Sequence, residues 1–155
     1  MSKYLWVGVA ALLCTAQAWA GEVKVSDAWA RATAPGQSGA AIQFSITSAE
    51  DAYLLDISSP VAGAVEIHKM KHEGGVMKMR AVKSLPLPAG KQVDLGASGN
   101  HVMLLNLKQP LKEGDSIPLI LTIQYTNKHK ESIKANAEVR PLTTSSDKHE
   151  HHDHH

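Results

Sequence analysis

Methionine and histidine gather in the central part of this chain and are the residues best suited to chemistry. Four of the five methionines follow residue 20, and each lies within two residues of another methionine or of a histidine: Met70, Met77, Met79 and Met103. Thioether sulfur is a soft, neutral ligand that selects Cu(I), and imidazole binds copper in either oxidation state. Zinc prefers thiolate, carboxylate or more imidazole ligands. These residue types therefore predict a copper site.

Methionine is also a flexible core filler, so strand periodicity is needed to separate the two interpretations. Successive side chains of a strand point to opposite faces. Within residues 64–70, His68 and Met70 share the face opposite to Val65 and Ile67, which are the expected core residues. The same alternation places two further pairs on shared faces: Met77 with Met79, and His101 with Met103.

Residues 71–75 form a spacer short enough to join two of these strands as an antiparallel hairpin. A turn centred on residues 73–74 would place His68 opposite Met79, and a turn centred on residues 74–75 would place Met70 there instead. Either register keeps the methionines of this hairpin on one side with His68. Periodicity alone therefore does not select one methionine of the hairpin as the ligand.

Four of these residues have a spacing that resembles a known motif. His68, ten residues, Met79, 21 residues, His101, one residue and Met103 match the H-x10-M-x21-H-x-M signature of the PCu(A)C periplasmic copper chaperones. The segment SDAWARATAPGQSGAA also resembles this family, and the similarity covers roughly residues 23–141. The resemblance implies a cupredoxin-like β-sandwich that binds one Cu(I) through these two histidines and two methionines. It also implies assembly of the dinuclear copper centre of cytochrome c oxidase, with the apo copper-bearing subunit and Sco-type thiol copper proteins as partners.

Several neighbouring residues are given supporting or neutral roles. Met70 and Met77 are interpreted as a hydrophobic rim, because a four-ligand site is already filled. Glu66 is either a solvated strand residue, which we favour, or an acceptor that fixes the tautomer of a histidine ligand. His72 and His129 fall in expected turns and are interpreted as exposed polar residues.

Short apolar and β-branched segments recur between turn signals, without a long stretch of helical period, and predict an all-β, two-sheet sandwich. Residues 84–90 (SLPLPAG) carry two prolines and are expected to form a loop. The expected strands are Glu22–Val25, Ala40–Thr47, Ala52–Ser58, Ala64–Met70, Val76–Val82, His101–Lys108, Ser116–Tyr125 and Glu131–Val139.

Residues 1–20 have the features of a signal peptide, with Lys3, an apolar run and an Ala18-Trp19-Ala20 cleavage site. We therefore expect export to the periplasm, with no membrane insertion after cleavage. Removal of the leader takes away the one cysteine, Cys14, and leaves 15 Lys and Arg against 15 Asp and Glu. The lack of cysteine excludes a disulfide scaffold, a thiol nucleophile and a thiolate copper centre. A formal charge of zero argues against nucleic acid as a partner.

Residues 21–141 are expected to form the single folded domain, and residues 142–155 a disordered tail. Imidazole without thioether suits Cu(II), so the tail is expected to bind this ion. An expression tag is the alternative, but Glu150 and Asp153 interrupt the histidine series, which favours a native extension. The five tail histidines are His149, His151, His152, His154 and His155.

The leading hypothesis is a carrier of Cu(I) and not an enzyme, because a four-ligand site leaves no open position for substrate. A periplasmic copper buffer or resistance protein without a dedicated oxidase acceptor would use the same residues. A copper redox enzyme is the less favoured alternative. Measurement of copper transfer to an apo-oxidase copper domain, with oxygen consumption as a control for the enzyme, separates these three.

Overall fold

The computed structural model describes residues 22–96 and 99–142 and contains ten strands and no helix in this part of the chain. The prediction of an all-β fold is therefore confirmed. None of the described residues forms a helix of the length and hydropathy needed to cross a bilayer. The strands are β1 (Val23–Arg31), β2 (Gly39–Ser48), β3 (Ala52–Ser58), β4 (Ala62–Glu73), β5 (Val76–Ala81), β6 (Leu85–Leu87), β7 (Gln92–Leu95), β8 (Asn100–Leu107), β9 (Ser116–Tyr125) and β10 (Lys130–Arg140).

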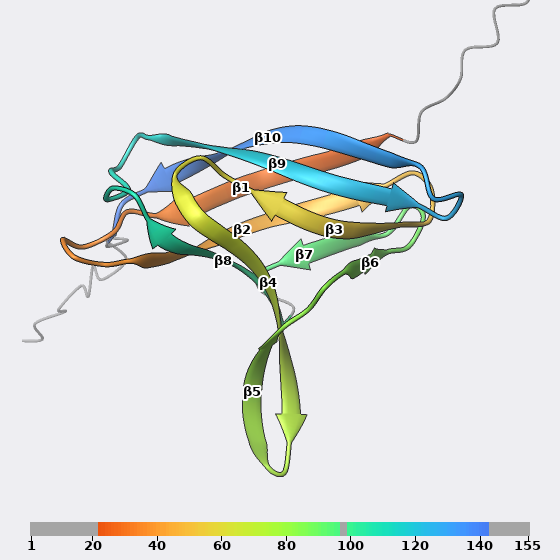
Figure 1. Ribbon diagram of the computed structural model, residues 1–155, viewed down its shortest axis with the longest axis horizontal. Helices are drawn as coiled ribbons and strands as arrows, with labels where there is room; N and C mark the ends of the chain where they lie inside the picture. The colour runs from red at the N-terminus through yellow and green to blue at the C-terminus, as the bar shows by residue number, and fades with distance from the viewer. Residues whose placement is uncertain (1–21, 97–98, 143–155) are drawn as a thin grey trace, which may run out of the picture.

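Hydrogen bonds join the strands in the order β5-β4-β8-β2-β1-β10-β9-β3-β6, with β7 paired to β2. The connected sheet curls over to give the two packed layers of a sandwich (Figure 1). β2 pairs with two different strands in succession: residues 39–42 pair with β8, and residues 44–47 pair with β7. β1 runs parallel to β10, and its register with β2 shifts between Ser26 and Trp29, where Asp27 has a φ of 52°.

The core lies between the layers and follows from the period-2 pattern of the strands. Alternate residues of β2 and β9 are buried, whereas their neighbours are partly or fully exposed. Each fully buried aliphatic side chain contributes roughly 1.5–3 kcal/mol of transfer free energy. The largest fully buried side chains are Ile42, Ile46, Leu54, Leu87, Leu95, Val102, Leu104, Ile117, Leu119, Leu121, Ile123 and Val139.

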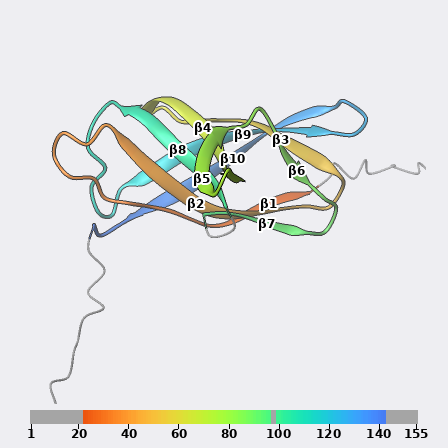
Figure 2. The same ribbon diagram turned by 90° about the horizontal axis from the view of Figure 1, so that it is seen from below.

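The hairpin of β4 and β5 projects from the body of the sandwich (Figure 1), and the view from below looks onto this hairpin (Figure 2). The first part of β4 pairs with β8 inside the sandwich, and its last residues pair with β5 alone. Every residue of β5 is exposed, so this strand buries nothing against the core. Gly74 and Gly75 form the turn with φ values of 60° and 80°, and glycine adopts this left-handed backbone at little cost.

Two short strands differ from the sequence-based expectation. Residues 84–90 were expected to form a loop, but Leu85–Leu87 forms β6 and pairs with β3. Pro86 is tolerated because β6 is the last strand of the sheet and needs to pair on one side only. β7 was not expected at all, and β1 and β4 are longer than predicted, ending at Arg31 and Glu73.

Candidate metal centre

Two histidines lie opposite each other on neighbouring strands, on the outer face of the sheet. The antiparallel pairing of β4 with β8 places His68 opposite His101. Side chains in such a pair have Cβ atoms roughly 4.5–5.5 Å apart, close enough for both imidazoles to reach one ion. Met103 follows His101 by two residues on the same strand face, and it lies opposite Glu66. Three of the four motif residues thus lie on two paired strands.

Met79 reaches the same face from the hairpin. The turn at residues 74–75 sets the register, and Met79 lies opposite Met70 while His68 lies opposite Ala81. Of the two registers that periodicity left open, the structure has the one that pairs these two methionines. Met79 is therefore a diagonal neighbour of His68, and diagonal pairs are within reach of long side chains. The structure brings all four motif residues to one face.

The two ring nitrogens of His68 are in different environments. Nε2 lies 2.7 Å from Oε2 of Glu66, and because a carboxylate only accepts, the Nε2–H donates. Nδ1 is buried and has no hydrogen-bond partner in the described structure. A bond at Nε2 fixes the tautomer in which Nδ1 carries a free lone pair. His68 is therefore prepared to donate this lone pair to a metal ion.

The contact of Glu66 corrects the sequence-based interpretation. Glu66 was favoured as a solvated strand residue, but its carboxylate holds His68. The side chain of Glu66 is 43% exposed and that of His68 is 19% exposed, so both residues of this pair are partly open to solvent. A carboxylate behind a histidine ligand is a common way to orient the ring and raise its basicity as a donor.

Asn100 is a residue of this region that sequence reasoning missed. It begins β8 directly before His101, and its Oδ1 is buried without a hydrogen-bond partner among the described residues. It also pairs in register with Lys69, and next to this pair the amide of Met70 donates to the carbonyl of Gly99 at 2.7 Å. An isolated asparagine beside a turn gives no sequence signal that separates it from a loop residue.

The remaining sequence-predicted residues lie farther out or elsewhere. His72 was expected in a turn but belongs to β4, where it lies opposite Met77 and is exposed. His129 lies in the turn after β9 and stacks on Tyr125, with ring centroids 6.0 Å apart. The expected signal peptide (residues 1–20) and the five tail histidines lie outside the described residues.

The ligand types limit which ion the site can hold. In residues 22–96 and 99–142, no three His, Cys, Asp or Glu side chains gather so that they could hold a metal ion. A metal on this face therefore needs thioether ligands in addition to the two imidazoles. Neutral sulfur with imidazole suits Cu(I) far better than zinc or hard divalent cations.

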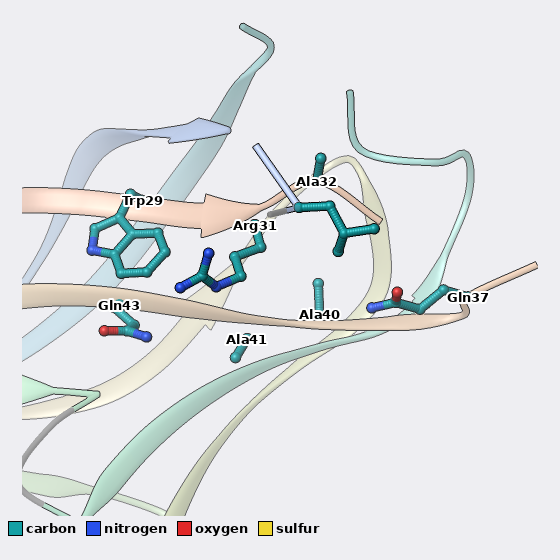
Figure 3. Close-up of a pocket in the computed structure, with 8 residues that line it drawn as sticks. Trp29, Arg31, Ala32, Gln37, Ala40, Ala41 and Gln43 are labelled. Atoms are coloured by element: carbon teal, nitrogen blue, oxygen red, sulfur yellow. The ribbon is translucent and has the colours of Figure 1, made fainter. Parts of the chain in front are cut away.

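A pocket of about 250 Å³ is lined mainly by residues of β1 and β2. Ala41 of β2 pairs in register with Met103 and also lines the pocket, together with Trp29 and Arg31 (Figure 3). The guanidinium carbons of Arg31 and Arg140 lie 5.4 and 4.7 Å from the centre of the Trp29 ring. The eight lining residues include no nucleophile and no carboxylate, so this pocket does not form a catalytic set.

The fold is that of the PCuAC domains. The chain superposes on the apo PCuAC domain of PmoF2 with a TM-score of 0.61 and 19% identity, covering 80% of this chain and 94% of that one. It is also similar to Cu(I)-bound DR1885 from Deinococcus radiodurans, with a TM-score of 0.56 and 27% identity over 84% of this chain and 85% of that one. These likenesses place the β-sandwich in a class with known copper-bound members.

The chain belongs to the LpqE-like family of the PCuAC class. The family's sequence model, described as "Putative lipoprotein LpqE-like", matches residues 23–139. A relative named "Putative lipoprotein Lxx21020", from Leifsonia xyli subsp. xyli, is 32% identical over 100 residues, which is 64% of this chain. The aligned part spans 60% of that relative's length.

Proposed function

We propose that this chain is an exported, periplasmic copper chaperone that binds one Cu(I) through His68, Met79, His101 and Met103. The observation that carries the proposal is the direct pairing of His68 with His101, together with the buried, unpartnered Nδ1 of His68. A buried nitrogen without a partner costs free energy unless something binds it. A Cu(I) ion supplies that partner.

The surface position of the site supports a carrier role. Met79 is 47% exposed and lies on a strand whose residues are all exposed, so an acceptor's ligands can approach the ion from that side. The four proposed ligands are all neutral, and a soft Cu(I) ion prefers thiolate when it is offered. Copper is thus expected to move from this site to a cysteine-bearing acceptor and not in the reverse direction.

We further propose acceptors that offer thiolate ligands for Cu(I). The dinuclear copper centre of cytochrome c oxidase is held by thiolates, so the apo copper-bearing subunit is the expected recipient, and Sco-type thiol copper proteins are alternative partners. A buffer or resistance role would use the same four residues but would lack a specific transfer step. A redox enzyme would need an open coordination position, which a filled four-ligand site does not provide.

The tail is proposed to recruit Cu(II). Its five histidines offer imidazole without thioether, which suits the oxidised ion, and three acidic residues accompany them. Because the tail directly follows the domain, a copper ion held there has a raised effective concentration near the Cu(I) site.

Cu(I) affinity and transfer test this function in the full chain. His101→Gln removes one ligand, and we expect its Cu(I) affinity, measured by competition with a colorimetric chelator, to fall by more than about tenfold. His129→Gln is the matched control, because that residue lies in the turn after β9 and stacks on Tyr125. Equal affinity in the two variants would overturn the assignment of the site.

Transfer is measured by mixing the Cu(I)-loaded chain with a purified apo-oxidase copper domain. We expect copper to appear in the acceptor, with no consumption of oxygen by the chain alone. Retention of copper by the chain would favour the buffer role, and turnover of oxygen would favour the enzyme.

A further inference from the structure

The outer half of the β4–β5 hairpin carries a second group of soft ligands. His72 lies directly opposite Met77, and Met70 lies opposite Met79. The two pairs are separated by one pair, Lys71 and Lys78, whose side chains point to the other face. His72 follows Met70 by two residues, so the side chains of their two pairs project from one face of the ribbon. Met70 is also the diagonal neighbour of Met77. One imidazole and two thioethers therefore form a triangle beyond the four motif residues.

Core packing does not explain Met77, whereas Met70 on the paired strand is half-buried. Met77 is 54% exposed, and the whole of β5 is exposed. A methionine that fills a core gap is buried against other apolar side chains. Exposed apolar residues grouped at the tip of a projecting hairpin need another reason to be there.

The opposite face of the ribbon is strongly cationic. Lys69 lies opposite Arg80, and Lys71 lies opposite Lys78, so like charges oppose each other in both pairs. Glu73 offsets part of this repulsion, with Oε2 at 2.9 Å from Arg80 and 3.8 Å from Lys78. A divalent ion held by uncharged ligands near four cations is disfavoured by Coulomb repulsion. A monovalent soft ion suffers half of that repulsion and gains more from thioether.

We propose that His72, Met77 and Met70 form a second, outer site for a soft monovalent cation of the Cu(I) and Ag(I) class. The site shares no ligand with the motif set, and it lies at the most projecting part of the molecule (Figure 1). Met70 stands two residues from His68 along β4, a separation of roughly 7 Å. An ion captured at the tip is thus one step away from the inner histidine pair.

Methionine methyl groups report the two sites separately in the full chain. The four methionines after residue 20 divide between the sites, and the histidine-rich tail has no methionine. Ag(I) is a suitable probe because it has the ligand preference of Cu(I) and is not oxidised in air. We expect the ε-methyl resonances of Met79 and Met103 to shift with one group of bound ions, and those of Met70 and Met77 to shift with another.

Two variants and a control give the decisive comparison. His72→Gln should abolish the Ag(I)-induced shifts of Met70 and Met77 and leave that of Met103 unchanged. Met103→Leu should instead weaken the shift of Met79 and leave those of Met70 and Met77 unchanged. Lys78→Gln changes the same strand on its other face and should leave all of these shifts in place. Amide resonances of residues 69–80 check that each variant keeps the hairpin register.

The outcomes separate this site from the inner one. A Met77 methyl that does not move when Ag(I) is in excess, or that moves equally in His72→Gln, would overturn the outer site. A Met77 shift without any Met103 shift would support the outer site and contradict the proposed function. A Met103 shift alone would leave the proposed function standing.

Discussion

His68 illustrates how a single residue is prepared for metal binding. Strand alternation predicts its face and its companions, because the period of 2 is a local property of the chain. Alternation also puts Glu66 on the same face, but the choice between solvent and His68 depends on side-chain rotamers and on the space left by β8. The hydrogen bond between Glu66 and His68 therefore becomes visible only in three dimensions.

Removal of the Glu66 carboxylate should weaken copper binding without unfolding the protein. In Glu66→Ala, the ring of His68 loses the acceptor that fixes its tautomer, and Cu(I) affinity should fall about 10–100-fold. The free energy of unfolding should fall by about 1 kcal/mol or less, because the change removes one hydrogen bond of a side chain that is 43% exposed. Chelator competition and urea unfolding measure the two quantities. Glu138→Ala removes a carboxylate on the exposed part of β10 and should change neither; an equal loss in both variants would mean that only overall charge matters.

The β4–β5 hairpin is the element that brings Met79, a proposed ligand, to the face of the histidine pair. Its spacer length predicts a hairpin, but two turn positions fit the sequence equally well. The consecutive glycines settle the register, since both adopt positive φ and form the two-residue turn. The strands β6 and β7 were missed for a related reason. They span three and four residues, and such short pairing depends on a neighbouring strand more than on local pattern.

A strained turn in the β4–β5 hairpin should lower the affinity for Cu(I) more than it lowers the stability of the fold. Gly74→Ala places a side chain at a φ of 60° and costs roughly 1–2 kcal/mol. Because β5 buries nothing, this cost should appear as fraying of the hairpin, and Cu(I) affinity should fall by up to about tenfold. The melting temperature should stay nearly constant.

Gly90→Ala provides the matched control for the turn. Gly90 has a φ of 69°, and a Cβ there would also meet open space, but it lies in the turn between β6 and β7. The Gly90→Ala variant should have the same Cu(I) affinity as the unmodified chain. Equal copper affinities for Gly74→Ala and the unmodified chain would contradict the coupling between this turn and copper binding.

At the scale of the whole molecule, the sandwich is a scaffold that holds the site on its outer face. The sequence predicts its class from short strands of alternating pattern, and the buried residues of β2 and β9 confirm that pattern. The order of the strands could not be predicted, because pairing of distant segments, such as β1 with β10, depends on the packing of the complete sheet. Tyr125 is a buried residue of this scaffold, and its hydroxyl donates to Oε2 of Glu131 at 2.7 Å.

Tyr125 makes stability sensitive to alkaline pH. Burial, followed by the hydrogen bond and negative charge of Glu131, raises the pKa of Tyr125 to about 12. In the unfolded chain the phenol has a pKa near ~10. The contribution of the neutral Tyr125 phenol to the free energy of unfolding is therefore fully present below pH ~10 and is lost as the pH rises towards 12. Urea unfolding at pH 7, 10 and 12 should show this loss.

Tyr125→Phe has no phenol to ionise, so its stability should fall less over the same alkaline range. At neutral pH it should be less stable by roughly 1 kcal/mol, because it lacks the hydrogen bond to Glu131. Parallel alkaline losses in the two proteins would show that another group causes the effect.

The direct test of the copper site is X-ray absorption of the full chain loaded with half an equivalent of Cu(I). Two histidines and two methionines on one face require both nitrogen and sulfur scatterers around copper. Met103→Leu keeps approximate side-chain volume, should cost less than about 1.5 kcal/mol of stability, and should reduce the sulfur signal. A coordination shell of nitrogen and oxygen alone would contradict the proposed centre.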